Sequence, residues 1–203
     1  MDKLETNEPK HDLLQLYKGH YFARRYKLSW RVGYVCPAIV DALHPTSLID
    51  AGCAIGEFVD GFLKLGVDAY GLEGTANVVN YIVLPRDRLY IGDLRTPITL
   101  GKRVDLALCL EVAEHIEPEY VEVFLDNLTR FSNQVLMSFA PPGQEGHGHW
   151  NCQEASYWIE KMAKRGYVFR SEVVDKVREG LEAVKTKREI RSYYNNLLFF
   201  EGI

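Results

Sequence analysis

The sequence predicts an α/β protein in which a mostly parallel sheet carries helices on both faces. Three observations support this. From Ser47 onward, strand-like and helix-like segments alternate, which is typical of parallel sheets with helical crossovers. At residues 48–58 a glycine-containing turn joins the first strand directly to a helix. Residues 104–110 are almost continuously apolar, as expected for a strand buried on both faces of the sheet.

The N-terminal part is predicted to be helical. Residues 1–10 are polar and expected to be frayed. Residues 11–43 follow a helical pattern that Pro37 is expected to divide, and His44-Pro45 ends it before the first strand. The aromatic residues between 11 and 34 predict either a lid over a ligand or core packing.

The sheet region predicts a regular series of elements. Strands are expected at 47–51, 68–73, 88–92, 104–110, 133–140, 166–174 and 194–201. Helices are expected at 57–65, 75–83, 118–131, 153–165 and 175–189, with a Gly/Pro/His-rich loop at 141–150. The 203 residues contain no repeat or linker, so we expect one domain with a helical extension at 1–44 and a core at 45–203.

Composition restricts the compartment and the partners. The first residues are too polar for a signal peptide, and no apolar run has the length of a membrane span. The four cysteines are widely spaced and form no C-x-x-C pair, which favours reduced thiols. We therefore expect a cytoplasmic protein with no membrane partner. The net charge of −4 gives no support to bulk attraction to nucleic acid.

The turn after the first strand is the clearest candidate ligand site. Gly52 and Gly56 lack a Cβ, so the backbone can turn sharply and a ligand can approach it. A dinucleotide fingerprint requires G-x-G-x-x-G, whereas Ala54 stands between these two glycines. Asp50 and Glu57 would repel a diphosphate and suit a cationic ligand that carries an amino group. The turn therefore favours S-adenosylmethionine (SAM) over NAD.

Three further acids stand where successive strands are expected to end. Glu73 ends the second strand, where a carboxylate can accept hydrogen bonds from both hydroxyls of a ribose. Asp93 ends the third strand, where it can accept from an adenine amino group, and Glu111 follows the fourth. Each acid alone is more often a helix cap or turn residue. Acids at four consecutive strand ends, beside a glycine turn, favour a nucleoside site.

This set of motifs resembles the class I SAM-dependent methyltransferase family over residues 45–201. The matching pieces are residues 50–56, Glu73, Asp93 and the segment LEVAEHI at 110–116. The resemblance implies a three-layer Rossmann-like sheet of seven strands, the last antiparallel. It implies that the turn holds the methionine part of SAM, Glu73 the ribose and Asp93 the adenine, although Ala54 departs from the commoner glycine. The cofactor-binding residues expected are Asp50, Gly52, Cys53, Ala54, Gly56, Glu57, Phe58, Glu73, Gly74, Asp93, Leu94, Leu110 and Glu111.

Two polar segments are candidates for the chemistry at the methyl acceptor. Methyl transfer requires an aligned acceptor, a dry site and, for a hydroxyl, removal of a proton. Glu111, Glu114 and His115 are spaced to share one face of a helix start. His147 and His149 lie in the glycine-rich loop, and an unperturbed imidazole titrates near neutrality. The catalytic candidates are Glu114, His115, His147 and His149.

The E-x-x-E-H pattern with later histidines is similar to two metal-using subgroups of the family. These are the O-methyltransferases of ubiquinone biosynthesis and the 2′-O-methyltransferases that act on small-RNA 3′ ends. The resemblance implies Mg²⁺ or Mn²⁺ at Glu111, Glu114, His115 and His149, with His147 as the alternative to His149. Many family members carry E-V-x-E-H with no known metal, and a metal-free histidine base is the other interpretation.

The sequence indicates the methyl acceptor less directly than it indicates the methyl donor. Basic residues at 24–27 and 185–191 are more often solvated helix faces, and favour a phosphate-bearing acceptor only if they converge on the pocket. We expect a SAM-dependent methyltransferase, O-directed, that acts on a small-molecule or glycan-like acceptor. The alternatives are a metal-assisted RNA 2′-O-methyltransferase and a non-catalytic module that binds SAM.

Overall fold

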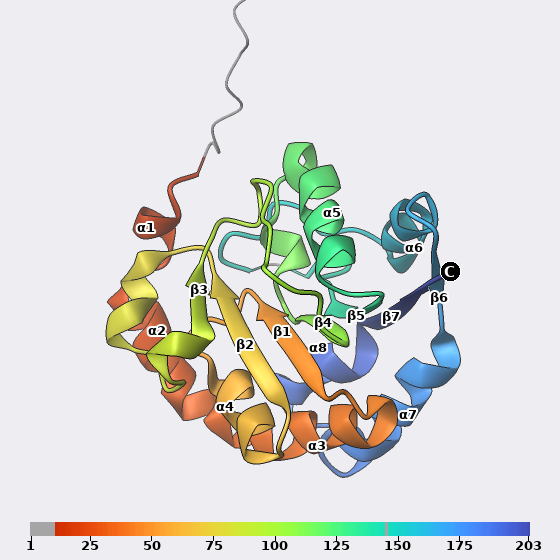
Figure 1. The fold of residues 1–203 in the computed structure, drawn as a ribbon, viewed down its shortest axis with the longest axis horizontal. Coiled ribbons are helices and arrows are strands. Elements are labelled where there is room, and N and C mark those ends of the chain that lie inside the picture. The colour runs from red at the N-terminus through yellow and green to blue at the C-terminus, as the bar shows by residue number, and fades with distance from the viewer. Residues whose placement is uncertain (1–10, 145) are drawn as a thin grey trace, which may run out of the picture.

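A computed structural model describes residues 11–144 and 146–203, and it confirms the predicted fold class (Figure 1). Seven strands form one sheet in the order β3-β2-β1-β4-β5-β7-β6. Strands β1 to β5 pair in parallel, and β7 runs antiparallel to both β5 and β6. The expectation for residues 1–10 lies outside the described part. The strands are β1 Ser47–Ala51, β2 Asp68–Glu73, β3 Leu89–Ile91, β4 Leu106–Cys109, β5 Gln134–Ser138, β6 Tyr167–Phe169 and β7 Leu197–Gly202.

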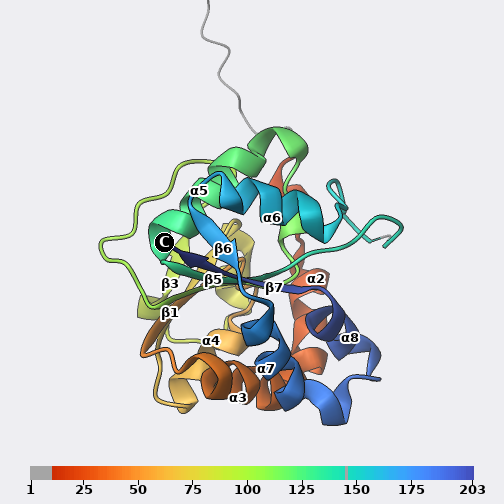
Figure 2. The same cartoon turned by 90° about the vertical axis from the view of Figure 1, so that its right-hand side faces the viewer.

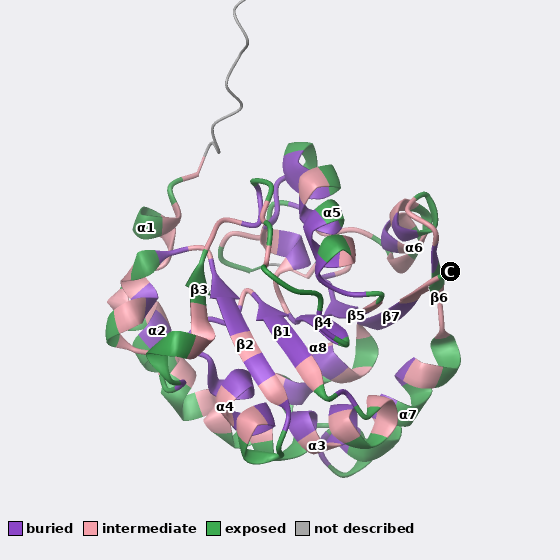
Figure 3. Cartoon of the chain, viewed as in Figure 1, coloured by how far each residue is buried: buried purple, intermediate pink, exposed green. Residues whose placement is uncertain are grey.

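Helices cover both faces of the sheet and complete three layers (Figure 2). One face carries α3 Val32–Leu43, α4 Glu57–Lys64, α7 Ser171–Leu181 and α8 Arg188–Asn195. The other carries α5 Val121–Phe131 and α6 Ala155–Ala163. The central strands are buried (Figure 3), because alternate side chains enter the two apolar layers: Leu48 packs with one and Ile49 with the other.

Short helices and turns precede the sheet and connect the larger elements. The N-terminal part contains α1 Leu13–Leu16, α2 Gly19–Arg25 and the 3-10 helix η1 Tyr26–Arg31. Further 3-10 turns are η2 Ala76–Asn80, η3 Arg86–Arg88, η4 Ala113–His115, η5 Pro118–Tyr120 and η6 Glu182–Val184. Within residues 11–144 and 146–203, no helix combines the length and apolar character that crossing a bilayer would require.

The expected division at Pro37 is wrong, because α3 continues through this residue. In an α-helix the amide missing at Pro37 would have met the carbonyl of Gly33. Gly33 is exposed, so water can satisfy that carbonyl and the helix can continue. The helical pattern of residues 11–43 is interrupted earlier, where η1 joins α2 to α3.

Other expected elements also differ from the structure, and the single helix expected at 175–189 is replaced by α7, η6 and α8. The predicted helix at 75–83 is only the short turn η2, and Asn77 within it donates side-chain hydrogen bonds to backbone carbonyls of α1 and its end. The predicted strand at 166–174 ends at Phe169, and α7 begins at Ser171. Val174, Val177 and Leu181 are buried at helical spacing, a signal that outweighs the β-branched composition of this segment.

Gly180 lies where α7 crosses α3, and we expect Gly180→Ala to destabilise the protein. A Cβ at this position would lie 2.6 Å from Ala38 Cβ and 2.9 Å from Ala38 Cα. Overpacking of this kind typically costs about 1–3 kcal/mol. Gly33→Ala is the matched control, since its Cβ would meet nothing within 4 Å, and it should stabilise α3 by up to ~1 kcal/mol. Urea unfolding of both variants measures the effects. Equal unfolding midpoints for the two variants would contradict the close approach of α7 to α3 at Gly180.

Candidate functional site

A pocket opens at the carboxyl ends of β1, β2 and β4, where ligands bind in open α/β sheets. Its empty space, counted out to the open mouth and including solvent there, is about 680 Å³. The first strand-end loop, the ends of β2 and β3, the segment after β4 and the N-terminal helices all contribute. The lining residues are Leu13, Leu16, Tyr17, Tyr21, Gly52, Ala54, Glu73, Gly74, Asp93, Leu94, Arg95, Glu111, Val112, His115, Ile116 and Trp150.

Three residues with left-handed backbone give the loop after β1 its sharp turns. Gly52, Ala54 and Gly56 have φ of 89°, 48° and 78°. A Cβ at Gly52 would collide with the side chain of Val112 across the pocket, so this glycine is needed for the close approach. A Cβ at Gly56 would collide with Leu84 instead, so Gly56 is needed for packing. Ala54 adopts a conformation that typically costs an L-residue about 1–2 kcal/mol.

Glu73 supports the strained loop from the end of β2. Its carboxylate accepts hydrogen bonds from the backbone N–H groups of Ala54 (3.0 Å) and Thr75 (3.1 Å). Burial raises the pKa of Glu73, and these backbone donors oppose that effect. The side chain also lines the pocket, so its remaining lone pairs are available to a ligand. Gly74 lines the pocket beside it, close to Leu13 of α1.

Asp93 and Leu94 lie on the neighbouring wall, as expected from the sequence. The Asp93 carboxylate is held by Arg95, whose Nη2 lies 2.8 Å from Asp93 Oδ2. Arg95 is buried and lines the pocket, and the sequence reasoning did not single it out. The sequence also did not indicate that Tyr17 and Tyr21 line the pocket, because the helical pattern of residues 11–43 only suggested a lid in general terms.

Several expected cofactor residues lie behind the pocket wall. Glu57 is buried and forms ion pairs with Arg25 (2.7 Å) and Arg31 (3.2 Å). Asp50 is fully enclosed, and burial followed by the charge of Glu57 raises its pKa to about 8. Cys53, Phe58, Gly56 and Leu110 are also absent from the lining. Because Arg25 pairs with the buried Glu57, it points into the protein. Arg24 and Lys27 of the same basic segment are exposed.

The segment after β4 does not form the helical face that the spacing of Glu111, Glu114 and His115 predicted. Glu111 has a φ of 58°, and the short 3-10 turn η4 follows. Glu111 Oε1 accepts a hydrogen bond from Ser138 Oγ at 2.7 Å, and Glu111 is not part of the cluster that Glu114 forms. It contributes to the pocket wall, while Glu114 and His115 form a separate cluster with His149.

This cluster is assembled by the loop that follows β5. The backbone N–H groups of Trp150 (2.9 Å) and Asn151 (3.0 Å) both donate to the carbonyl oxygen of Glu114. These two bonds bring His149 beside η4, with its ring 5.0 Å from the ring of His115. Ligand atoms of Glu114, His115 and His149 lie within 4.8 Å of one another. His147 is exposed and outside the cluster.

The chemistry of these three side chains fits a divalent cation. His115 Nδ1 lies 2.8 Å from the Gly148 carbonyl and His149 Nδ1 lies 2.9 Å from that of Gln144. Donation from Nδ1 leaves the Nε2 lone pair as the ligand, an orientation common at metal sites. Burial lowers the pKa of His115 to about 4, so its imidazole is neutral.

The carboxylate of the cluster has an unused acceptor atom. Oε2 of Glu114 is buried and has no hydrogen-bond partner among the described residues. Burial, together with the charge of Glu111, raises the pKa of Glu114 to about 8. A buried oxygen without a partner is costly, and a cation would satisfy it. One carboxylate and two imidazoles suit a divalent transition-metal ion such as Mn²⁺ better than Mg²⁺, which prefers oxygen ligands.

No protein-family model and no curated protein matches the chain. It is similar to magnesium protoporphyrin IX methyltransferase (ChlM) from Synechocystis PCC 6803 with bound SAM, with 19% identity over 89% of this chain and 82% of that chain, and a TM-score of 0.62. The sugar N-methyltransferase KedS8 from Streptoalloteichus sp ATCC 53650 shows 14% identity, 87% and 92% coverage, and a TM-score of 0.63. The methyltransferase domain of bacterial CtHen1-C shows 18% identity, 86% and 98% coverage, and a TM-score of 0.61. The chain therefore has the class I SAM-dependent methyltransferase fold.

Proposed function

We propose that the protein is a SAM-dependent methyltransferase that methylates a hydroxyl group beside a divalent cation. The observation that carries the proposal is the shared wall between two sites. His115 lines the pocket and also belongs to the cluster with Glu114 and His149. A methyl donor in the pocket and a hydroxyl at the cluster would therefore be neighbours, as in-line transfer requires.

The pocket residues would bind and orient the donor. Glu73 would accept hydrogen bonds from the ribose, and Asp93 from the adenine amino group, beside the loop at Gly52 and Ala54 that lines the pocket. When bound, SAM supplies a methyl group that its sulfonium charge already activates. Tyr17, Tyr21 and Leu16 cover the pocket from the N-terminal side and limit access of water.

Glu114, His115 and His149 would hold Mg²⁺ or Mn²⁺ on the acceptor side. When bound, such a cation lowers the pKa of a coordinated hydroxyl and stabilises the alkoxide. The carbonyls of Gly148 and Gln144 fix the two imidazoles, so the loop after β5 presents its ligand at a defined place. A small-molecule or glycan-like alcohol is the acceptor that we favour, since the pocket mouth is open and the net charge is −4.

A second acceptor class is the 2′-hydroxyl of RNA. Its support is the set of candidate metal ligands, Glu114, His115 and His149. The sequence resemblance links E-x-x-E-H and a later histidine to 2′-O-methyltransferases, and both CtHen1 methyltransferase structures have the same fold, at 22% and 18% identity. The exposed Lys187, Arg188 and Arg191 do not line the pocket, so they add no support to this class.

Ligand-dependent stabilisation tests the cofactor assignment. SAM and S-adenosylhomocysteine should raise the thermal unfolding temperature, whereas NAD should not. A ligand present at 100 times its dissociation constant stabilises the native state by about 2.7 kcal/mol. Transfer of label from SAM to separate pools of RNA, protein and metabolites then identifies the acceptor class. Stabilisation by NAD alone, or by none of the three, would contradict the proposed function.

A further inference from the structure

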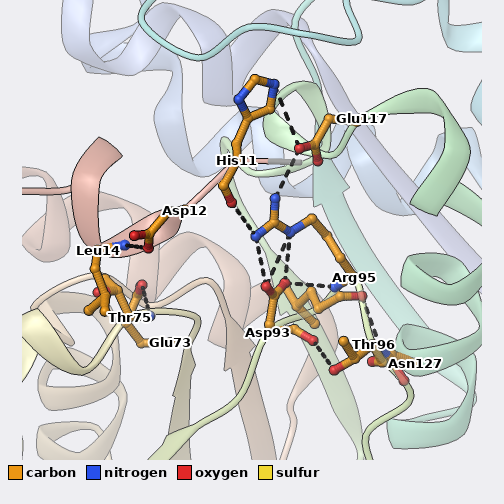
Figure 4. A network of polar contacts seen from close by, with 11 residues as sticks. His11, Asp12, Leu14, Glu73, Thr75, Asp93, Arg95, Thr96, Glu117 and Asn127 are labelled. Atoms are coloured by element: carbon orange, nitrogen blue, oxygen red, sulfur yellow. Dashed lines mark hydrogen bonds and ion pairs between the residues drawn. The ribbon is translucent and has the colours of Figure 1, made fainter. Parts of the chain in front are cut away.

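Arg95 connects three segments around the pocket (Figure 4). Its guanidinium contacts the Asp93 carboxylate, donates from Nη1 to Glu117 Oε1 (2.9 Å) and donates from Nη2 to the His11 carbonyl (2.9 Å). The guanidinium carbon also lies 5.9 Å from the ring centre of Tyr120. A buried side chain with this many defined contacts has one conformation, so it can fix its partners in turn.

Arg95 sets the orientation of Asp93 but leaves it able to bind a ligand. Asp93 Oδ1 accepts from the backbone N–H (2.9 Å) and Nε (3.0 Å) of Arg95, and Oδ2 accepts from Nη2 (2.8 Å). Nε also lies 3.2 Å from Oδ2, so this one N–H is shared between the two oxygens, and three N–H donors serve about four lone-pair directions of the carboxylate. Asp93 keeps a quarter of its side chain exposed and lines the pocket. The exposed part of the Asp93 carboxylate can therefore accept a hydrogen bond from a ligand in the pocket.

Arg95 also holds the N-terminal segment that covers the pocket. We call residues 11–17 the strap; Leu13, Leu16 and Tyr17 of this strap line the pocket. At one end, the strap is held by the Arg95 bond to His11, and the His11 ring stacks on Trp150 with centres 4.3 Å apart. At the other side of the pocket, Asn77 Nδ2 donates to the carbonyls of Leu14 (2.9 Å) and Tyr17 (3.1 Å).

The contacts of Arg95 need a guanidinium. The planar fork reaches Asp93, Glu117 and His11 simultaneously, whereas a lysine ammonium is a point donor on a flexible stem. Glu117 is also buried, and its Oε2 has no hydrogen-bond partner within the described part of the chain. The charge of Arg95 thus compensates two carboxylates next to the pocket.

We propose that Arg95 is a positioning residue that aims Asp93 at the adenine amino group and holds the strap closed over the bound nucleoside. The inference rests on the proposed function, since it takes a SAM-type nucleoside as the ligand. It predicts that one side chain controls both base discrimination and the rate of ligand release. Asn77 should affect only the second property, because it contacts the strap and not Asp93.

The test compares S-adenosylhomocysteine with S-inosylhomocysteine, in which a carbonyl oxygen replaces the adenine amino group. Calorimetry gives the two dissociation constants, and stopped-flow fluorescence gives the release rate of S-adenosylhomocysteine. Wild type should prefer the adenosyl ligand by roughly 10- to 100-fold, the value of a hydrogen bond to a charged acceptor. Arg95→Lys and Arg95→Gln should bring this ratio towards one and accelerate release. Asn77→Ala should accelerate release and keep the ratio.

The outcomes separate the possible explanations. Equal weakening of both ligands in the Arg95 variants, with the ratio preserved, would make Arg95 merely structural and overturn the inference. A changed ratio with unchanged release would overturn the role in closing the strap. A wild-type ratio near one would overturn adenine recognition by Asp93. Wild type that binds neither nucleoside would refute the proposed function itself. Circular dichroism checks folding, and Arg95→Lys, which keeps the charge, decides the test if Arg95→Gln does not fold.

Discussion

A His149→Ala variant is expected to bind SAM as tightly as wild type and to transfer methyl groups about 10²–10⁴-fold more slowly, the range typical for loss of proton-transfer assistance. SAM affinity should be kept because His149 does not line the nucleoside pocket. The rate should fall because His149 completes the cluster with Glu114 and His115, which we propose activates the acceptor hydroxyl.

The measurements are kcat for the acceptor found in the label-transfer screen and calorimetric binding of Mn²⁺ with SAM present. Glu114→Gln should lose Mn²⁺ binding as His149→Ala does, since both remove a ligand of the cluster. His147→Ala should have a much smaller effect, because His147 is exposed and outside the cluster. His44→Asn, before the opposite end of β1, is the control for general effects of losing a histidine.

Two results would contradict this prediction. A wild type that binds no Mn²⁺ or Mg²⁺ and is fully active in EDTA would exclude the metal and leave a histidine base. A His149→Ala variant with normal kcat would remove the cluster from the chemistry altogether. Loss of SAM affinity in the same variant would instead indicate that the loop after β5 supports the pocket.

Glu73→Gln is expected to weaken SAM binding by about 100-fold or more, since hydrogen bonds to a charged acceptor contribute about 1.5–3 kcal/mol each and a ribose offers two hydroxyls. The same change places an NH₂ group where a carboxylate oxygen accepts from Ala54 or Thr75. The strained loop at Ala54 should therefore also lose stability. Calorimetry measures the affinity, and urea unfolding without ligand measures the stability.

Asp68→Asn is the matched control for Glu73→Gln. Asp68 lies at the other end of β2, where it pairs with Arg88 and Lys102 at the surface. Surface ion pairs contribute roughly 0–1 kcal/mol, so the control should unfold only slightly earlier and bind SAM normally. An unchanged SAM affinity in Glu73→Gln would show that the carboxylate supports only the loop.

The sequence was sufficient for the parts of the fold that depend on local signals. The strand, glycine turn and helix at 47–64 lie as predicted, because hydrophobic period and backbone freedom are local properties. The acids at strand ends gather at one edge because parallel strands present their carboxyl ends together, and Glu73, Asp93 and Glu111 all line the pocket. Whether they bind SAM stays a prediction.

The long-range partners could not be predicted. Glu57 looked available for a ligand, yet Arg25 and Arg31 from the N-terminal helices occupy it, and nothing local indicates that pairing. Arg95 is two residues from Asp93, but its other contacts, His11 and Glu117, come from distant segments. The spacing of E-x-x-E-H suggested a helical face, whereas Glu111 has a left-handed backbone and only the short 3-10 turn η4 follows it.

The loop after β5 has a fixed base and an exposed tip. Its base is tied by the Gln153 N–H to the Ala140 carbonyl (3.1 Å) and by the two amides that meet the Glu114 carbonyl. Pro142, Gly143 and His147 towards the tip are exposed. The tip can therefore vary in sequence without rebuilding the hydrogen bonds at the base of the loop. The same division lets a library of loop variants be confined to the tip, so that the base and the residues beside η4 keep their contacts.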